Sequence, residues 1–174
     1  MNNLLSTLKK EFLPITLILV LVLSRIIPHP WNFTPILATG IFSGFYFKNL
    51  ISGFFVVAFS MFLGDLYLGF HNTMFFTYIS VSIAVGIGFY IRQFKFSQII
   101  FSSILSSVSF FIITNFGFWL LSDIYQKSLY GLLESYLMAI PFFHNTLIST
   151  FIYLVILKLI YDFFLKKKLF RASV

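Results

Sequence analysis

Six apolar segments, separated by short polar connections, account for most of this 174-residue chain. A helix that crosses a lipid bilayer needs about 20 predominantly apolar residues, with a usual range of about 17–25. The second segment is short for a span, so we expect it either to tilt little or to end inside the protein. The apolar runs predict six transmembrane helices, at about residues 12–27, 34–47, 50–68, 74–91, 98–121 and 142–165.

The composition supports a bilayer as the solvent. Hydrophobic residues make up 59% of the chain and charged residues 10%, whereas an ordinary globular domain has about 45–50% and about 25%. The 26 phenylalanines are too many for one small core to bury. Cysteine is absent, which excludes disulfides and thiolate metal sites. We therefore predict an all-α integral membrane protein that forms one domain over residues 1–174.

The basic residues predict the orientation, because short cytoplasmic loops carry an excess of Lys and Arg. If the N-terminus is cytoplasmic, only Arg25 and Lys127 of the twelve basic residues lie outside. Both termini are then cytoplasmic, as the even number of spans requires, in a multi-pass protein of the cell inner membrane. The net charge of +7 is thus a topology signal and not a nucleic-acid footprint. The ten residues on the inner side are Lys9, Lys10, Lys48, Arg92, Lys95, Lys158, Lys166, Lys167, Lys168 and Arg171.

The sequence RIIPHPWNFTP, residues 25–35 and here called the strap, interrupts the apolar pattern. Each proline fixes its own φ and pushes the preceding residue towards extended conformations, so we expect a stiff, extended segment. Thr34 is expected to cap the second helix, with Pro35 in its first turn. In the predicted orientation the strap is extracytoplasmic.

Arg25 and Asp65 are predicted at the outer ends of the first and third helices. An ion pair between them would make both charges tolerable at the membrane boundary, and we favour this structural role over ligand binding.

The segment between the fifth and sixth spans predicts a short amphipathic helix over about residues 129–140, lying in the interface or over the outer mouth. Pro141 is expected to end it. Its apolar face is formed by Leu129, Leu132, Leu133, Tyr136, Leu137 and Ile140.

Small residues recur four positions apart in two of the spans. Gly40 and Gly44 form one such pair, and Ala84 and Gly88 form another. This spacing is typical of close helix packing, and we favour packing inside the protein over packing against a partner.

Histidine, asparagine and tryptophan side chains concentrate at the predicted outer ends of the helices. Asn115 is costly in hydrocarbon without a partner, so it should face the interior together with Trp119, four residues later. These residues predict a pocket among the ends of the last three helices, closed by the strap. The candidate ligand-binding residues are His29, Trp31, Asn32, His71, Asn72, Asn115, Trp119, His144 and Asn145.

The chemistry of this pocket is narrowed by missing motifs. Three outer histidines and Asp65 suit a transition metal, but no HExxH spacing or close His pair is present. No Ser–His motif supports catalysis, and no GxxxxGK[ST] loop supports ATP-driven transport. We expect no enzyme activity and no cofactor, and a one-sided pocket favours capture of an external small-molecule solute.

Four patches carry a resemblance: RIIPHPWNFTPILA, GDLYLGFHNTM, FFIITNFGFW and GLLESYLMAIPFFHNT. They resemble an uncharacterised family of small bacterial six-helix membrane proteins, similar to the S components of energy-coupling-factor (ECF) vitamin transporters. The resemblance implies cytoplasmic termini, a vitamin-like solute bound near the outer face, and a separate ATPase module that energises uptake. S components often dock that module through an AxxxA motif on the first helix, which here reads LPITLILVLVLS without alanine.

The alternative is a membrane scaffold similar to MreD of the cell-shape machinery, which has about this length and six helices. A pocket filled by the protein's own side chains would favour the scaffold, and a hollow one the solute binder.

Overall fold

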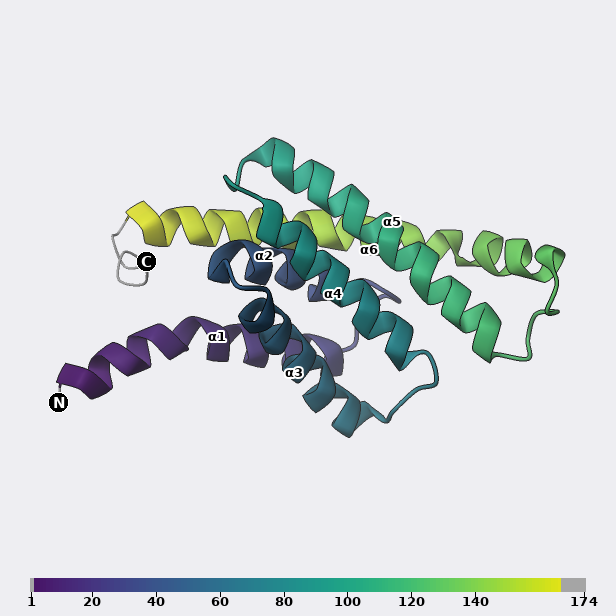
Figure 1. The fold of residues 1–174 in the computed structure, drawn as a ribbon, viewed down its shortest axis with the longest axis horizontal. Helices are drawn as coiled ribbons and strands as arrows, with labels where there is room; N and C mark the ends of the chain where they lie inside the picture. Colours follow the sequence, from purple (N-terminus) through teal and green to yellow (C-terminus); the bar gives the residue numbers. More distant parts are fainter. Residues whose placement is uncertain (1, 167–174) are drawn as a thin grey trace.

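The computed structural model describes the backbone of residues 2–166 and the side chains of residues 12–163, and this part of the chain is all-helical, with no strands. Successive helices run back and forth along the bundle (Figure 1). The side chains of Lys9, Lys10, Lys166, Lys167, Lys168 and Arg171 lie outside the described residues. The helices are α1 (Asn2–Ile26), α2 (Ile36–Phe47), α3 (Leu50–Leu68), α4 (Met74–Tyr90), α5 (Phe96–Leu121) and α6 (Leu129–Lys166).

Local signals set the bounds of α3, which agree with the predicted 50–68. The side chain of Asn49 accepts hydrogen bonds from the backbone N–H groups of Ile51 and Ser52, at 2.9 and 3.1 Å. These are donors that the first turn of a helix leaves without an intrahelical partner. At the other end Gly69 has φ of 96°, which a residue with a side chain rarely adopts.

Three helical segments are long and apolar enough to cross a membrane: Leu50–Leu68, Phe96–Leu121 and Leu129–Phe163. The segments Phe12–Ile26, Ile36–Phe47 and Met74–Tyr90 are apolar but shorter. The outside of the bundle is also apolar, and phenylalanines on three helices are each more than 60% exposed: Phe55, Phe75 and Phe101. These features indicate a membrane protein.

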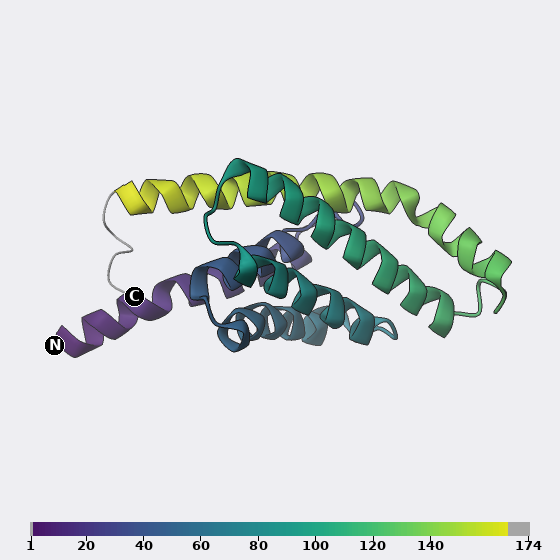
Figure 2. The same ribbon diagram turned by 45° about the horizontal axis from the view of Figure 1, so that its top comes forward.

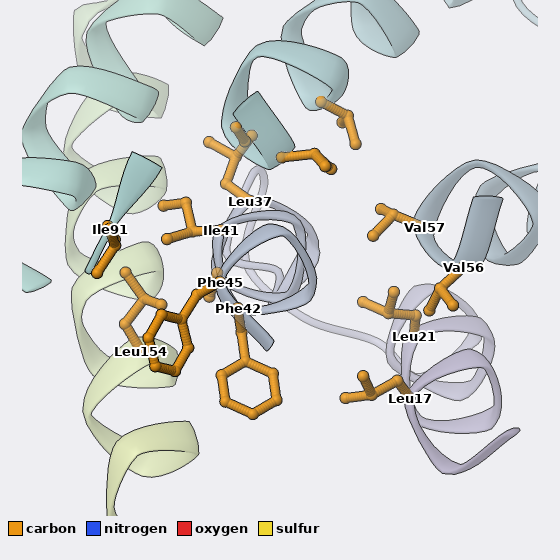
Figure 3. Close-up of a cluster of buried hydrophobic side chains, with 14 of the residues drawn as sticks. Leu17, Leu21, Leu37, Ile41, Phe42, Phe45, Val56, Val57, Ile91 and Leu154 are labelled. Carbon is orange, nitrogen blue, oxygen red and sulfur yellow. The ribbon is translucent and has the colours of Figure 1, made fainter. Parts of the chain in front are cut away.

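The short helix α2 lies at the centre of the bundle, where all residues from Leu37 to Phe45 are buried. Figure 3 shows Ile41 and Phe45 of α2 pointing towards Leu154 of α6, while Leu21 of α1 and Val57 of α3 point towards α2 from the other side. A helix that is apolar on all sides belongs in a core. Twelve residues span only about 18 Å at 1.5 Å per residue, which is less than the hydrocarbon thickness of a bilayer, about 30 Å.

Helices α2 and α4 meet backbone to backbone. A methyl group added at Gly44 would overlap the carbonyl group of Val85, and one added at Gly88 would overlap that of Ile41. Gly40 faces Ala84 at the same crossing. The two small-residue pairs therefore serve internal packing, as predicted, because only residues without bulky side chains allow this approach.

Aromatic rings fill the bundle near the 91–95 connection between α4 and α5. The ring of Phe45 stacks on that of Phe94 with centroids 4.8 Å apart, and Tyr161 meets Phe45 edge-on at 5.5 Å. Phe42 also packs against Phe94 and Tyr161. We call this end of the bundle, with residues 48–49 and 91–95, the closed end. The end with the strap and the α3–α4 loop is the strap end.

The predicted short helix over 129–140 is wrong as a separate element, because α6 runs without a break from Leu129 to Lys166 and contains Pro141. Proline removes one backbone hydrogen bond and its ring clashes with the preceding turn, which a helix can accommodate by bending. Figure 2 shows the green first part of α6 inclined to the yellow remainder.

The orientation of that first part was also unexpected. Its buried side is a row of small residues spaced four apart, Gly131, Ser135 and Ala139, of which Gly131 packs against the backbone of Gln126 in the α5–α6 connection. Leu129, Leu133 and Leu137 are exposed. Packing against α5 sets the rotation of this part of α6, and the leucines therefore face outwards. Exposed leucines are favourable in contact with lipid and unfavourable in contact with water. Tyr136 donates a hydrogen bond to the carbonyl oxygen of Ile112 on α5, at 2.7 Å.

Candidate functional site: a cavity beneath the strap

A cavity of about 850 Å³ lies at the strap end of the bundle. Its volume falls within the range of about 300–1,000 Å³ that is usual for small-molecule sites. The strap forms one wall, and all six helices contribute lining residues. Two of the lining groups, Thr150 and Leu37, are almost fully buried, whereas Trp31 at the strap is 79% exposed. The cavity therefore reaches from an exposed rim into the bundle.

The strap was expected to be extended throughout, but it makes a turn. The N–H of Phe33 donates to the carbonyl oxygen of Pro30 at 2.9 Å, and Asn32 has φ of 59°. Asparagine tolerates this left-handed conformation better than most residues. The expected cap at Thr34 is also absent, because α2 begins at Ile36 with Pro35 in the cap position and no side-chain hydrogen bond. Thr34 instead lines the cavity.

One face of α6 holds the strap in place. Asn145 Nδ2 donates to the carbonyl oxygen of Trp31 at 2.9 Å. One turn later, the single proton of Ser149 Oγ is shared between the carbonyl oxygens of Thr146, at 3.1 Å, and Asn32, at 3.4 Å. A further turn on, the ring of Tyr153 meets that of Phe33 edge-on, with centroids 6.1 Å apart. Three successive strap residues thus contact α6 positions i, i+4 and i+8, which share one face.

Arg25 and Asp65 form the expected ion pair, with Arg25 Nη2 at 2.5 Å from Asp65 Oδ1. Arg25 Nη1 also donates to the carbonyl oxygen of Met61 at 2.8 Å, and Tyr78 donates to Asp65 Oδ2 at 2.8 Å. Asp65 is fully buried, so both its oxygens need these partners. Gly64 makes room for the guanidinium group, which a Cβ there would contact at 3.0 Å.

The α3–α4 loop contributes another part of the rim. His71 Nδ1 lies 3.0 Å from Thr73 Oγ1, and the His71 carbonyl oxygen accepts from the N–H of Met74 at 3.1 Å. This tight turn holds the imidazole at the rim, and both His71 and Thr73 line the cavity.

Five of the nine candidate ligand-binding residues line the cavity: His29, Trp31, Asn32, His71 and Asn115. The lining does not include the other four, Asn72, Trp119, His144 and Asn145.

Those four residues lie elsewhere. Asn145 anchors the strap, and Trp119 Nε1 donates to the carbonyl oxygen of Gln126 at 2.9 Å, within the α5–α6 connection. Asn72 and His144 are exposed. Asn115 and Trp119 therefore do not act together on one ligand, although they lie four residues apart.

The sequence reasoning missed the threonines that line the cavity. Thr73 and Thr77 are four residues apart, and so are Thr146 and Thr150, so each pair occupies one helix face. This spacing was the available signal, but threonine is common in apolar helices and its spacing alone singles out no site. The lining threonines are Thr34, Thr73, Thr77, Thr114, Thr146 and Thr150.

Over the part of the chain that the structure describes, no three His, Asp or Glu side chains come together as potential metal ligands. His29 and His71 both line the cavity, but His144 is not part of that lining. The described lining of the cavity consists mainly of hydrogen-bonding and apolar side chains.

Comparison with known proteins identifies a family but no characterised relative. No curated protein and no solved structure matches the chain. The sequence model of one family, described as a family of unknown function, matches residues 6–172. That match includes the strap and all the cavity-lining residues, and the chain belongs to this family, DUF6580.

Proposed function

We propose that this protein is a membrane solute-binding component, similar to an ECF transporter S component, which captures a small vitamin-like molecule in the cavity beneath the strap. The strap end faces the extracytoplasmic side in this proposal, and both termini are cytoplasmic in a six-span protein of the inner membrane. The observation that carries it is the cavity at the strap end, to which all six helices contribute and which combines polar with apolar lining groups. A second hollow, of about 540 Å³ beside the closed end, lies between α4 and α5 alone and is lined mostly by apolar residues.

The lining suits a solute with both polar and apolar parts. Ile27, Leu37 and Met61 supply apolar surface, and the threonines and Asn115 supply hydrogen-bonding groups. Binding sites for small molecules combine these in the same way, with a few polar groups fixing the orientation. The anchored turn of the strap holds one wall in shape before binding, which reduces the entropy lost when a solute enters.

The aromatic rings packed around Phe45 and Phe94 at the closed end weigh against a channel, since a pore needs polar groups along its whole length. The cavity weighs against a scaffold similar to MreD, because a scaffold has no need of a hollow interior. The proposal includes a separate ATPase module as a partner. It assigns no docking surface for that module, because α1 lacks the alanine motif that S components often carry.

Native mass spectrometry of gently purified full-length protein tests the binding function. We expect a stoichiometric small molecule in the wild type that is lost in Asn115→Leu, which alters the cavity. The matched control is Asn72→Leu, which changes the same residue type at an exposed position outside the lining. If repeated preparations hold no small molecule and retain a membrane protein partner instead, the scaffold function replaces this one.

A further inference from the structure

We infer that the cavity selects a ligand that donates hydrogen bonds, through a neutral or cationic nitrogen group carried on an apolar body, and that it discriminates against carboxylates and phosphates. This inference rests on the proposed function and specifies the solute class. It follows from which hydrogen-bonding atoms of the lining are already committed within the protein.

Four of the six threonine hydroxyls that line the cavity donate their protons to carbonyl oxygens one turn earlier in the chain. Thr114 Oγ1 donates to the Phe110 carbonyl oxygen at 2.7 Å, and Thr150 Oγ1 to that of Thr146 at 2.7 Å. Thr146 does the same to Phe142 at 3.0 Å, and Thr77 to Thr73 at 3.3 Å. A hydroxyl has one proton and two acceptor lone pairs, so each group offers acceptor capacity to the cavity.

Two other polar side chains follow the same rule. Asn115 Nδ2 donates to the carbonyl oxygen of Phe111 at 2.8 Å, which leaves its Oδ1 as an acceptor. His29 Nδ1 lies 2.9 Å from the carbonyl oxygen of Pro30. Because a carbonyl oxygen only accepts, Nδ1 carries a proton, and in the neutral ring Nε2 is an acceptor.

The guanidinium group of Arg25, which lines the cavity, already pairs with Asp65. The two terminal nitrogens of Arg25 donate to Asp65 and to the Met61 carbonyl oxygen, and Tyr78 occupies the second oxygen of Asp65. Among the described lining residues, no Lys and no second Arg is available to an anion. The lining side chains that can still donate include Trp31, Asn32 and His71, which are exposed. A carboxylate that passed them into the buried part of the cavity, around Thr146 and Thr150, would lose its hydration and meet mainly acceptors, which is unfavourable.

Apolar groups account for the body of the ligand. Ile36, Leu37, Phe110 and Phe142 line the cavity on three helices, and Trp31 stands at its rim. The threonine and asparagine acceptors come from α4, α5 and α6. In the inferred pose the nitrogen group of the ligand meets these acceptors, and its apolar body lies against the aliphatic and aromatic side chains.

Thermal unfolding of the full chain in detergent, with two matched probes, tests the selection. Tryptamine and indole-3-propionate share one indole body and one linker, and differ in ending in an ammonium or a carboxylate. We expect tryptamine to raise the Tm and to bind at least about tenfold more tightly than indole-3-propionate, a difference of about 1.4 kcal/mol. Equal or tighter binding of indole-3-propionate would overturn the inference while leaving a binding protein intact.

Variants locate the effect. Thr150→Val removes an acceptor at nearly constant shape, and we expect it to weaken tryptamine about 2- to 10-fold, as for one hydrogen bond. Thr16→Val is the control, because Thr16 Oγ1 also donates to its own helix, at 2.7 Å to Phe12, but does not line the cavity. Equal effects of the two variants would contradict the assignment of the acceptors.

A second variant covers the case in which Thr150→Val fails to fold. Asn115→Asp keeps the size of the side chain, replaces the amide group that donates to Phe111 and adds a negative charge. The added charge should tighten tryptamine and weaken indole-3-propionate, whereas loss of the hydrogen bond alone would affect both probes equally. Unchanged affinity for both probes overturns the inference. If the wild type binds neither probe, the inference fails; an independent search by native mass spectrometry then decides whether the proposed function fails with it.

Discussion

The side-chain amide of Asn145 donates a 2.9 Å hydrogen bond to the backbone carbonyl oxygen of Trp31, 114 residues earlier in the chain. This contact ties the turn of the strap to α6, and Ser149 and Tyr153 continue the attachment one and two turns further on. The wall of the cavity is therefore held by a helix that also lines its interior with Thr146 and Thr150.

We expect Asn145→Leu to loosen the strap without unfolding the bundle. One neutral hydrogen bond contributes about 0.5–1.5 kcal/mol net, so solute affinity should fall about 2- to 10-fold. Hydrogen exchange at the backbone amides of residues 31–33 should become faster. His144→Leu, at the adjacent exposed position, should leave that exchange unchanged, and equal effects of the two variants would argue against an anchoring role for Asn145.

The buried pair of Arg25 and Asp65 should be sensitive to the loss of one partner. Asp65→Asn leaves the guanidinium group of Arg25 without its counter-charge, and breaking a buried pair in this way costs about 3–5 kcal/mol. Unfolding in detergent, followed by the Tm, measures the loss. The control is Asp162→Asn, which breaks the 2.9 Å pair of Lys158 and Asp162 on the surface of α6. Asp162 is 43% exposed, and such a pair contributes only about 0.3–0.5 kcal/mol.

The α2–α4 crossing predicts opposite effects for two glycines of the same helix. Gly88→Ala places a methyl group against the backbone of Ile41 and should destabilise the protein by at least about 1–3 kcal/mol through overpacking. Gly86→Ala meets nothing within 4 Å and should be neutral or stabilising, because alanine is favoured over glycine in a helix by about 1 kcal/mol. Similar Tm values for the two variants would mean that the helices do not cross as closely as described.

Single cysteines test the orientation, because the natural chain has no cysteine. Asn72→Cys lies in the α3–α4 loop at the strap end, and Gln93→Cys lies in the connection at the closed end; both positions are exposed. A membrane-impermeant maleimide applied to intact cells should label Asn72→Cys but not Gln93→Cys, which should react only after the cells are permeabilised. The reverse pattern would place the cavity on the cytoplasmic side.

The positions of the helices were largely predictable because their signals are local. The apolar runs and their breakers located α2, α3, α4 and α5 within about two residues. The error at residues 129–140 arose because proline ends a helix or bends it, and only packing on α5 decides between the two.

The site was predictable in outline but not residue by residue. Histidine, asparagine and tryptophan at one end of the helices pointed to the strap end, yet Trp119 and Asn145 make contacts within the protein. The threonines that line the cavity could not be singled out from the sequence. A hydroxyl that bonds to its own helix can face either lipid or a cavity. The rotation of each helix decides which of these it faces, and that rotation depends on contacts with the other helices.

By itself, the sequence determined the helical class, the apolar surface and the approximate helix bounds. The reason is that backbone N–H and C=O groups in lipid have no water to bond to, so a long apolar segment satisfies them within a helix. The tertiary structure alone decided that the strap turns at Asn32, that α6 holds it, and that acceptors from three helices converge on one cavity. The physical reason is that these features depend on pairs of residues far apart in the chain, whose distance is set by how the small residues of α2, α4, α5 and α6 let the helices pack.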